Sequence, residues 1–158
     1  MPRRAKAIKK KTEPDPVYKN RLVTKLINRS MRNGKKSIAQ RHVYGSFEIV
    51  KEKGKDPMDV FSKALENIRP TMEVRPRRVG GAAYQVPMSV RGIRRDSLAI
   101  RWLIMSARAR SNAEYNTFSE KLAAELLEAA KGEGGAVKRK TDMERMAEAN
   151  RAFAHFRW

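Results

Sequence analysis

The first part of the chain carries three runs of apolar side chains at the spacing of amphipathic helices, three to four residues apart. These runs occupy residues 19–31, about 35–54 and 57–69. The third run has the clearest start, because Asp56 can cap a helix and Pro57 fits the first helical position at no cost. We therefore predict three consecutive helices.

The apolar pattern then changes to strict alternation in residues 72–88, which is typical of strands. Gly80 and Gly81 lie between the two alternating runs and supply the backbone freedom of a tight turn. Pro76 and Pro87 cannot donate ladder hydrogen bonds, so both belong on edge strands. Since a two-stranded ribbon consists only of edges, we predict a β-hairpin arm that projects from the helices.

Helical spacing returns after the hairpin, over residues 94–110. The side chains expected to form the buried side of this fourth helix are Leu98, Trp102, Met105 and Ala109. Thr117 and Glu120 have the spacing of a capping box and mark the start of a fifth helix, which Gly132 ends. A sixth helix is expected to begin near Val137 or Thr141 and to fray after residue 150.

These elements define a mainly α fold class, with a six-helix domain, a projecting two-stranded β-ribbon arm and a basic N-terminal extension. The 158 residues are an ordinary size for a single domain. Its parts are expected to be the N-terminal arm at 1–16, the hairpin arm at 72–88, and the C-terminal helix and tail at 136–158.

The net charge of the chain limits the classes of function to consider. The chain has 36 Lys and Arg against 17 Asp and Glu, a net charge of +19, which favours a polyanionic partner such as nucleic acid. A membrane partner is not expected, because no apolar run approaches the roughly 18 residues needed to span a bilayer. The basic N-terminus also resembles a transit peptide, although those are usually longer and rich in serine. The absence of cysteine fits a reducing compartment, so we expect the cytoplasm.

The basic residues gather on separate elements instead of alternating with acids, which distinguishes a binding surface from solubilising charge. In the N-terminal arm they include Arg3, Arg4, Lys6 and Lys10, and at the entrance of the second helix they are Lys35 and Lys36. In the ribbon they are Arg75, Arg77 and Arg78, and in and around the fourth helix Arg91, Arg94, Arg95, Arg101, Arg108 and Arg110.

Catalytic and metal-binding patterns are absent from the sequence. His42 and His155 are far apart in the sequence, and neither lies in an H-x-x-E-H pattern or beside a group of aspartates. We therefore expect neither a metal nor a cofactor. Glu120, Glu125 and Glu128 are predicted to be solvated on a helix surface, so no acid–base pair is implied and no enzyme is predicted.

RNA is favoured over DNA because proteins grip RNA phosphates and junctions with arms, ribbons and arginine planes. Tyr84 on the ribbon could stack on a base, but packing at the base of the ribbon or against a neighbouring helix explains it equally well. Trp102 is predicted to belong to the core and not to a stacking surface.

Seven short segments spread over the whole chain resemble bacterial small-subunit ribosomal protein seven and its universal family. They are PDPVY at 14–18, NGKKS at 33–37, RRVGG at 77–81, YQVP at 84–87, LAIRW at 98–102, RMAEAN at 145–150 and AHFRW at 154–158. The resemblance implies a structural protein that binds the head-domain RNA of the small subunit first and nucleates assembly of the head. It also implies neighbouring ribosomal proteins as partners, and a position at the subunit interface near the exit-site tRNA and the mRNA path.

By the same resemblance, the tip of the hairpin lies nearest to tRNA and mRNA. Its residues are Arg78, Val79, Gly80, Gly81, Ala82 and Tyr84. The sequence departs from the family pattern at Pro76, Ala83 and Gly92-Ile93, which puts the ribbon angle and the start of the fourth helix in doubt. Asn116 and Phe118 also depart, so no RNA contact is assigned to residues 115–117.

Two other classes of protein remain as alternatives. A basic DNA-organising protein would bind duplexes without preferring a folded ribosomal RNA. An RNA-modifying enzyme would need a cofactor loop or an acid–base pair, and the glycine pairs Gly80-Gly81 and Gly134-Gly135 lie in a turn and a linker instead. The sequence leaves open whether the protein also binds its own messenger.

Overall fold

The computed structural model describes residues 12–156, and this part folds as six α-helices, one short 3₁₀ helix and a two-stranded antiparallel sheet. The helices before the sheet are α1 (Arg21–Ser30), α2 (Lys36–Glu52) and α3 (Pro57–Ile68). The strands are β1 (Met72–Val79) and β2 (Ala82–Ser89), followed by α4 (Ile93–Ala109), α5 (Phe118–Lys131), α6 (Gly135–Ala149) and η1 (Arg151–Phe156). The mainly α fold with a β-ribbon is confirmed. The predicted contacts at Arg3, Arg4, Lys6 and Lys10 lie outside the described residues.

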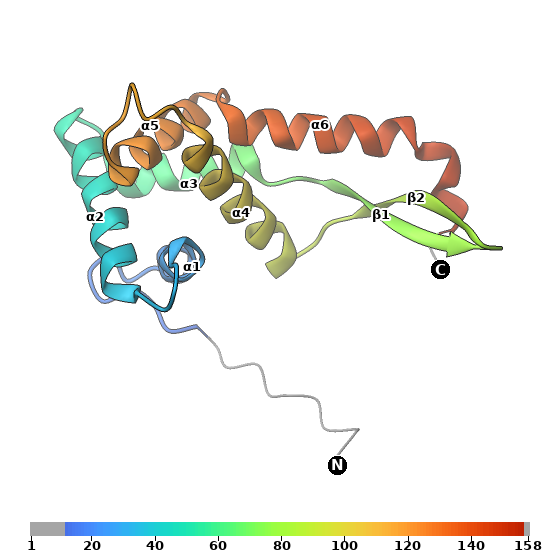
Figure 1. Cartoon of the computed structure of the whole chain (residues 1–158), viewed down its shortest axis with the longest axis horizontal. Coiled ribbons are helices and arrows are strands. Elements are labelled where there is room, and N and C mark those ends of the chain that lie inside the picture. Colours follow the sequence, from blue (N-terminus) through green and yellow to red (C-terminus); the bar gives the residue numbers. More distant parts are fainter. Residues whose placement is uncertain (1–11, 157–158) are drawn as a thin grey trace, which may run out of the picture.

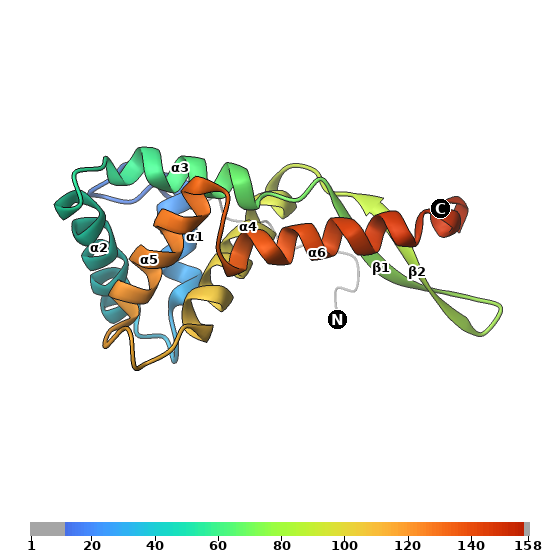
Figure 2. The ribbon, with the colours of Figure 1, turned by 90° about the horizontal axis from the view of Figure 1, so that it is seen from above.

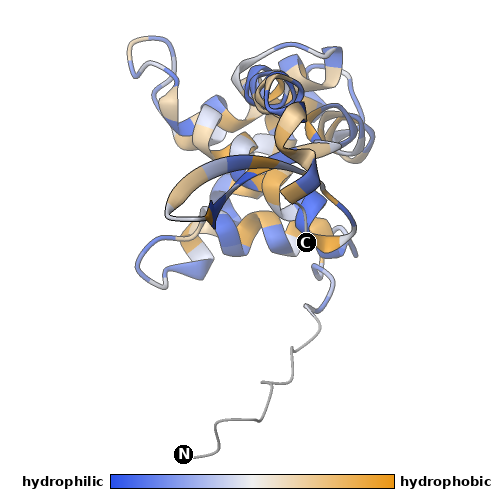
Figure 3. Cartoon of the chain, turned by 90° about the vertical axis from the view of Figure 1, so that its right-hand side faces the viewer, coloured by the Kyte–Doolittle hydropathy of each residue, from blue (hydrophilic) through white to orange (hydrophobic). Residues whose placement is uncertain are grey.

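Helices α1 to α5 form a body at one end of the molecule, and the ribbon projects from it with α6 running alongside (Figures 1 and 2). Helices α1 to α5 share one core, in which Phe47 of α2 and Phe61 of α3 are fully buried with their ring centres 5.8 Å apart. The helices carry hydrophilic and hydrophobic residues together, as amphipathic helices around a shared core must (Figure 3). Trp102 is buried in this core, as predicted.

Local capping signals act as the sequence indicated. The Asp56 carboxylate accepts a hydrogen bond from the backbone N–H of Met58 at 3.1 Å, at the start of α3. Thr117 and Glu120 form a reciprocal capping box at the start of α5, and Gly132 ends this helix in the left-handed conformation with φ of 87°.

Two predictions about side-chain environment were wrong. Met105 and Ala109 lie on the exposed side of α4, because this helix packs against α1, α3, α5 and α6 through a face that includes Leu103 and Ala107. Glu125 is not solvated but buried, because it pairs with Arg110. The other two glutamates of that prediction are partly exposed.

The sixth helix begins at Gly135, slightly earlier than predicted, because its cap comes from another helix. The Glu125 carboxylate of α5 accepts a hydrogen bond from the backbone N–H of Ala136 at 2.8 Å. Gly135 also lies so close to α4 that a Cβ atom there would meet the Ser106 side chain at 3.2 Å. Neither constraint is local, so neither is visible in the sequence around residue 135.

The hairpin pairs Met72 with Ser89 at its root and Val79 with Ala82 at its tip, without a bulge. Gly80 and Gly81 both have positive φ, 58° and 89°, which is the backbone geometry of a tight type I′ turn. After α6 the chain does not simply fray, since residues 151–156 form the η1 helix and pack against β2.

Candidate nucleic-acid interface

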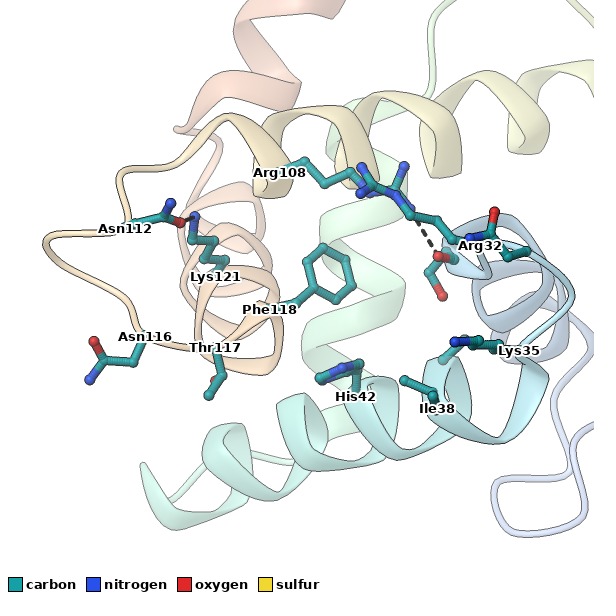
Figure 4. A pocket seen from close by; sticks show the side chains of 13 residues that line it. Arg32, Lys35, Ile38, His42, Arg108, Asn112, Asn116, Thr117, Phe118 and Lys121 are labelled. Carbon is teal, nitrogen blue, oxygen red and sulfur yellow. Dashed lines mark hydrogen bonds between the residues drawn. The ribbon is translucent and has the colours of Figure 1, made fainter.

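A hollow of about 420 Å³ opens where the end of α1, the start of α2, the end of α4 and the start of α5 meet (Figure 4). Four cationic side chains line it together with the ring of Phe118, and none of the lining residues described is acidic. The cations are Arg32, Lys35, Arg108 and Lys121. The hollow therefore offers positive charge beside an aromatic face.

Arg108 is held in a fixed orientation in this hollow. Its Nη2 donates to the backbone carbonyl of Ser30 at 2.8 Å, and its guanidinium lies 5.9 Å from the centre of the Phe118 ring. Burial, and then repulsion from the nearby Arg32 and Arg29, lowers the pKa of Arg108 from its usual value. A cluster of three guanidinium groups costs free energy, which an anion bound among them would recover.

The rim of the hollow is a loop that Arg110 and Lys121 anchor. Arg110 lies in a cage of carboxylates, with Nη2 2.6 Å from Glu125 Oε2 and Nη1 3.0 Å from Glu128 Oε1. Lys121 Nζ donates to the backbone carbonyl of Arg110 at 2.6 Å and to the side chain of Asn112 at 2.5 Å. Although burial alone would lower the pKa of Arg110, its hydrogen bonds to Glu128 and Glu125 raise it above the ordinary value.

A second hollow, of about 330 Å³, lies between the middle of α1 and the start of α4. Lys25 and Arg29 line it together with the exposed Ile93. An acidic residue lies nearby: the Asp96 carboxylate is 2.9 Å from Arg69 Nε and 3.8 Å from Lys25 Nζ.

Together the two hollows follow the contact between α1 and α4 along its length. The exposed Arg101 lies on α4 between them, on the same side of the helix as Ser97 and Arg108. We call this surface the α1–α4 face, formed by Lys25, Arg29, Arg32, Lys35, Arg101 and Arg108.

The ribbon separates its arginines onto two faces, because side chains alternate along a strand. Arg75 and Arg77 lie on the face that carries Tyr84 and Val86, while Arg78 lies on the opposite, exposed face. Arg75 pairs with the buried Glu73, and Arg94 Nε donates to the same carboxylate at 2.7 and 2.9 Å.

The structure thus divides the predicted RNA-contacting residues into groups. Lys35, Arg101 and Arg108 lie on the α1–α4 face, and Arg78 is exposed on the ribbon. Among the others, Lys36 and Arg91 are exposed and Arg77 and Arg95 are half-buried. The remaining three, Arg75, Arg94 and Arg110, are engaged by carboxylates.

Lys25, Arg29, Arg32 and Lys121 belong to the site but were missed from the sequence, as was Phe118. A signal for two of them exists, since residues 29–36 contain four cations and no acid around a helix end. Lys121 gives no such signal, because it lies on α5 among glutamates and reaches the hollow only through the fold.

Within residues 12–156 no cluster of His, Asp or Glu is arranged to hold a metal ion. None of the helices within this range combines the length and the apolar composition of a membrane span. A helical body with a cationic, partly aromatic face and a basic ribbon is typical of structural proteins that bind nucleic acid.

Comparison with known proteins gives the particular family. Residues 2–151 match the family model described as ribosomal protein S7p/S5e. The chain is 58% identical to a protein of Caldicellulosiruptor saccharolyticus, 57% to one of Moorella thermoacetica and 56% to one of Carboxydothermus hydrogenoformans, each over the full length of both chains. Each of these relatives is named small ribosomal subunit protein uS7. The chain belongs to the ribosomal protein S7p/S5e family.

Proposed function

We propose that this protein is a structural constituent of the small ribosomal subunit and binds ribosomal RNA through the α1–α4 face and the exposed side of the ribbon. Membership of the S7p/S5e family and full-length similarity to uS7 proteins support the ribosomal role, in the cytoplasm and without catalytic activity. The observation that carries the RNA interface is the hollow in which Arg32, Lys35, Arg108 and Lys121 lie beside the Phe118 ring, with no acidic residue among the described lining.

The finer role follows from the family resemblance. The protein binds the head-domain RNA directly, nucleates assembly of the head and contacts neighbouring ribosomal proteins. The tip of the ribbon, from Arg78 to Tyr84, lies at the subunit interface near the exit-site tRNA and the mRNA path. The form of the ribbon supports this placement, because it extends away from the helical body (Figure 2).

Chemically, the hollow suits a nucleotide in an irregular or single-stranded region. Arg32, Lys35 and Arg108 supply donors for phosphate, and the Phe118 ring beside them supplies a surface on which a base can stack. We leave Arg110 out of the proposed interface, because its three guanidinium nitrogens donate to protein oxygens.

The deciding experiment is a salt titration of binding to a head-domain RNA fragment, to an unrelated folded RNA and to duplex DNA of equal length. If about 6–10 phosphates are neutralised, affinity falls by orders of magnitude between roughly 50 and 200 mM salt on every ligand. We expect the head-domain fragment to keep a large advantage at physiological salt. Equal binding to all three ligands would replace the proposal with the alternative of a generic nucleic-acid-organising protein.

Charge-matched double variants locate the interface. Arg32→Gln with Arg108→Gln removes two charges from the α1–α4 face, and Arg139→Gln with Arg145→Gln removes two from the exposed side of α6. We expect the first pair to weaken head-domain binding at least tenfold more than the second, and to reduce the salt slope by about 2. Equal losses would show that net charge alone sets the affinity.

A further inference from the structure

The C-terminal η1 helix packs against the ribbon through aromatic rings. The ring centre of Tyr84 on β2 lies 5.3 Å from that of Phe153 and 5.2 Å from that of Phe156. The His155 ring adds a further contact, 3.9 Å from Phe156. The two separations from Tyr84 are those of favourable aromatic pairs, each worth about 0.5–1.5 kcal/mol beyond the area buried.

Such a contact stabilises the ribbon, because an isolated two-stranded hairpin is at best marginally stable in water. A first set of contacts anchors it at its root. The Glu144 carboxylate of α6 accepts hydrogen bonds from the backbone N–H and the hydroxyl of Thr71, at 2.9 and 2.7 Å. Tyr84 lies most of the way to the tip, paired with Arg77, so η1 holds the ribbon at a second point.

Contacts at both the root and the outer part of the ribbon fix its direction relative to the helical body, whereas a contact at the root alone would let the ribbon pivot there. Helix α6 runs alongside the ribbon between these points and acts as a strut (Figures 1 and 2). In the outer part of the ribbon the contacts lie on one face: Tyr84 packs against η1, while Arg78 and Gln85 are exposed on the other face.

We propose that Phe153 and Phe156 are positioning residues that clasp the ribbon through Tyr84 and set its angle to the helical body. The clasp leaves the Arg78 face open and holds it at a constant distance from the α1–α4 face. The consequence for RNA rests on the proposed function, since it requires Arg78 to contact the same RNA that the α1–α4 face binds.

The position of the ribbon can be measured without RNA. The chain has no cysteine, so spin labels can be attached through Ala82→Cys at the tip and Lys63→Cys on the exposed side of α3. In the full-length protein we expect a single narrow distribution of distances between the labels, which broadens or shifts when Phe153→Ala and Phe156→Ala are combined. Met146→Ala is the matched control, because this exposed side chain lies on α6 outside the aromatic cluster.

Rings of similar shape test whether stacking is the cause. Phe153→Tyr with Phe156→Tyr keeps both rings and is expected to restore the narrow distribution. Thermal unfolding is followed in parallel, and the alanine variant is expected to keep the cooperative transition of the body because neither phenylalanine is buried in the core. An unchanged distance distribution in a folded alanine variant would overturn the clasp.

A double-mutant cycle tests the consequence for RNA. Arg78→Gln is expected to weaken head-domain binding by about tenfold when the clasp is intact and by less than about threefold when both phenylalanines are alanine. Equal losses in the two backgrounds would overturn the positioning role. No loss in either background would instead refute the proposed RNA contact of Arg78. The distances between the spin labels would then be the test of the clasp.

Discussion

Arg110 Nη2 and Glu125 Oε2 lie 2.6 Å apart, and the Glu125 side chain is 1% exposed. The other oxygen of this carboxylate accepts the backbone N–H of Ala136 at the start of α6. One buried carboxylate therefore joins the residue that follows α4, the middle of α5 and the first turn of α6.

Replacing this carboxylate is expected to be costly. Glu125→Gln leaves the Arg110 guanidinium without its most buried partner and should lower the free energy of unfolding by about 2–4 kcal/mol. Urea unfolding at neutral pH measures the loss. Glu148→Gln is the control, because Glu148 is 74% exposed and its ion pair with Arg151 should contribute less than about 0.5 kcal/mol. Similar losses in the two variants would contradict the junction role of Glu125.

The carboxylates around Arg110 predict that Arg110 and Arg108 have different roles, the first in stability and the second in RNA binding. Arg110→Gln should lower stability by about 1–3 kcal/mol but leave the salt slope of RNA binding unchanged, because its nitrogens bind carboxylates and not phosphates. Arg108→Gln should reduce the slope by about 1. Unfolding curves and salt titrations on the two variants check this division, and a lower slope for Arg110→Gln would place that residue in the interface.

The root of the ribbon should respond to acid through Glu73. Burial raises the pKa of this buried carboxyl, but hydrogen bonds from Arg94 and Arg75 outweigh it and lower the pKa below the ordinary value. A carboxylate of this kind stabilises the folded protein above its unfolded pKa of about 4.3, and the contribution is lost as pH falls through the lower folded value.

Glu73→Gln should therefore cost about 1–2 kcal/mol at pH 7, and the difference from wild type should shrink below about pH 4. Urea unfolding as a function of pH measures both quantities. Glu66→Gln on the exposed side of α3 provides the comparison and should show little difference at any pH. A pH-independent cost at residue 73 would indicate a loss of packing and not of charge.

Phe118 should contribute to RNA affinity without contributing to its salt dependence. Phe118→Leu keeps apolar volume against His42 but removes the aromatic face in the hollow. We expect affinity for the head-domain fragment to fall by about 1–2 kcal/mol with the salt slope unchanged, as stacking predicts. Tyr at the same position should restore binding, and a parallel change in slope would argue that the substitution disturbs the neighbouring arginines.

Local signals explain what the sequence predicted well. Asp56 before Pro57, Thr117 before Glu120, and the paired glycines of the turn each act within a few residues, and each formed the expected structure. Arg110 and Glu125 are 15 residues apart and belong to different elements, so no local signal indicates that this glutamate is buried.

The residues of the candidate interface also fall into those that the sequence predicts and those that only the fold brings to the site. Lys35 and Arg108 were proposed from charge clustering, and the structure brings them to one hollow. Lys121 reaches that hollow only because α5 folds against α4, and Met105 is exposed because four neighbours, and not the helix itself, determine which side of α4 is covered.

The continuous register of the ribbon has a consequence for how its length can vary. With Arg77 opposite Tyr84 and no bulge between root and tip, the face on which each side chain lies depends only on whether its distance from the root is odd or even. Deleting one residue from each strand would turn Arg78 toward the strut and Arg77 outward, whereas deleting two would shorten the ribbon and keep its faces. The ribbon can therefore change its length by two residues per strand and keep its faces. A change of one residue per strand would exchange the exposed Arg78 face with the Tyr84 face that packs against η1.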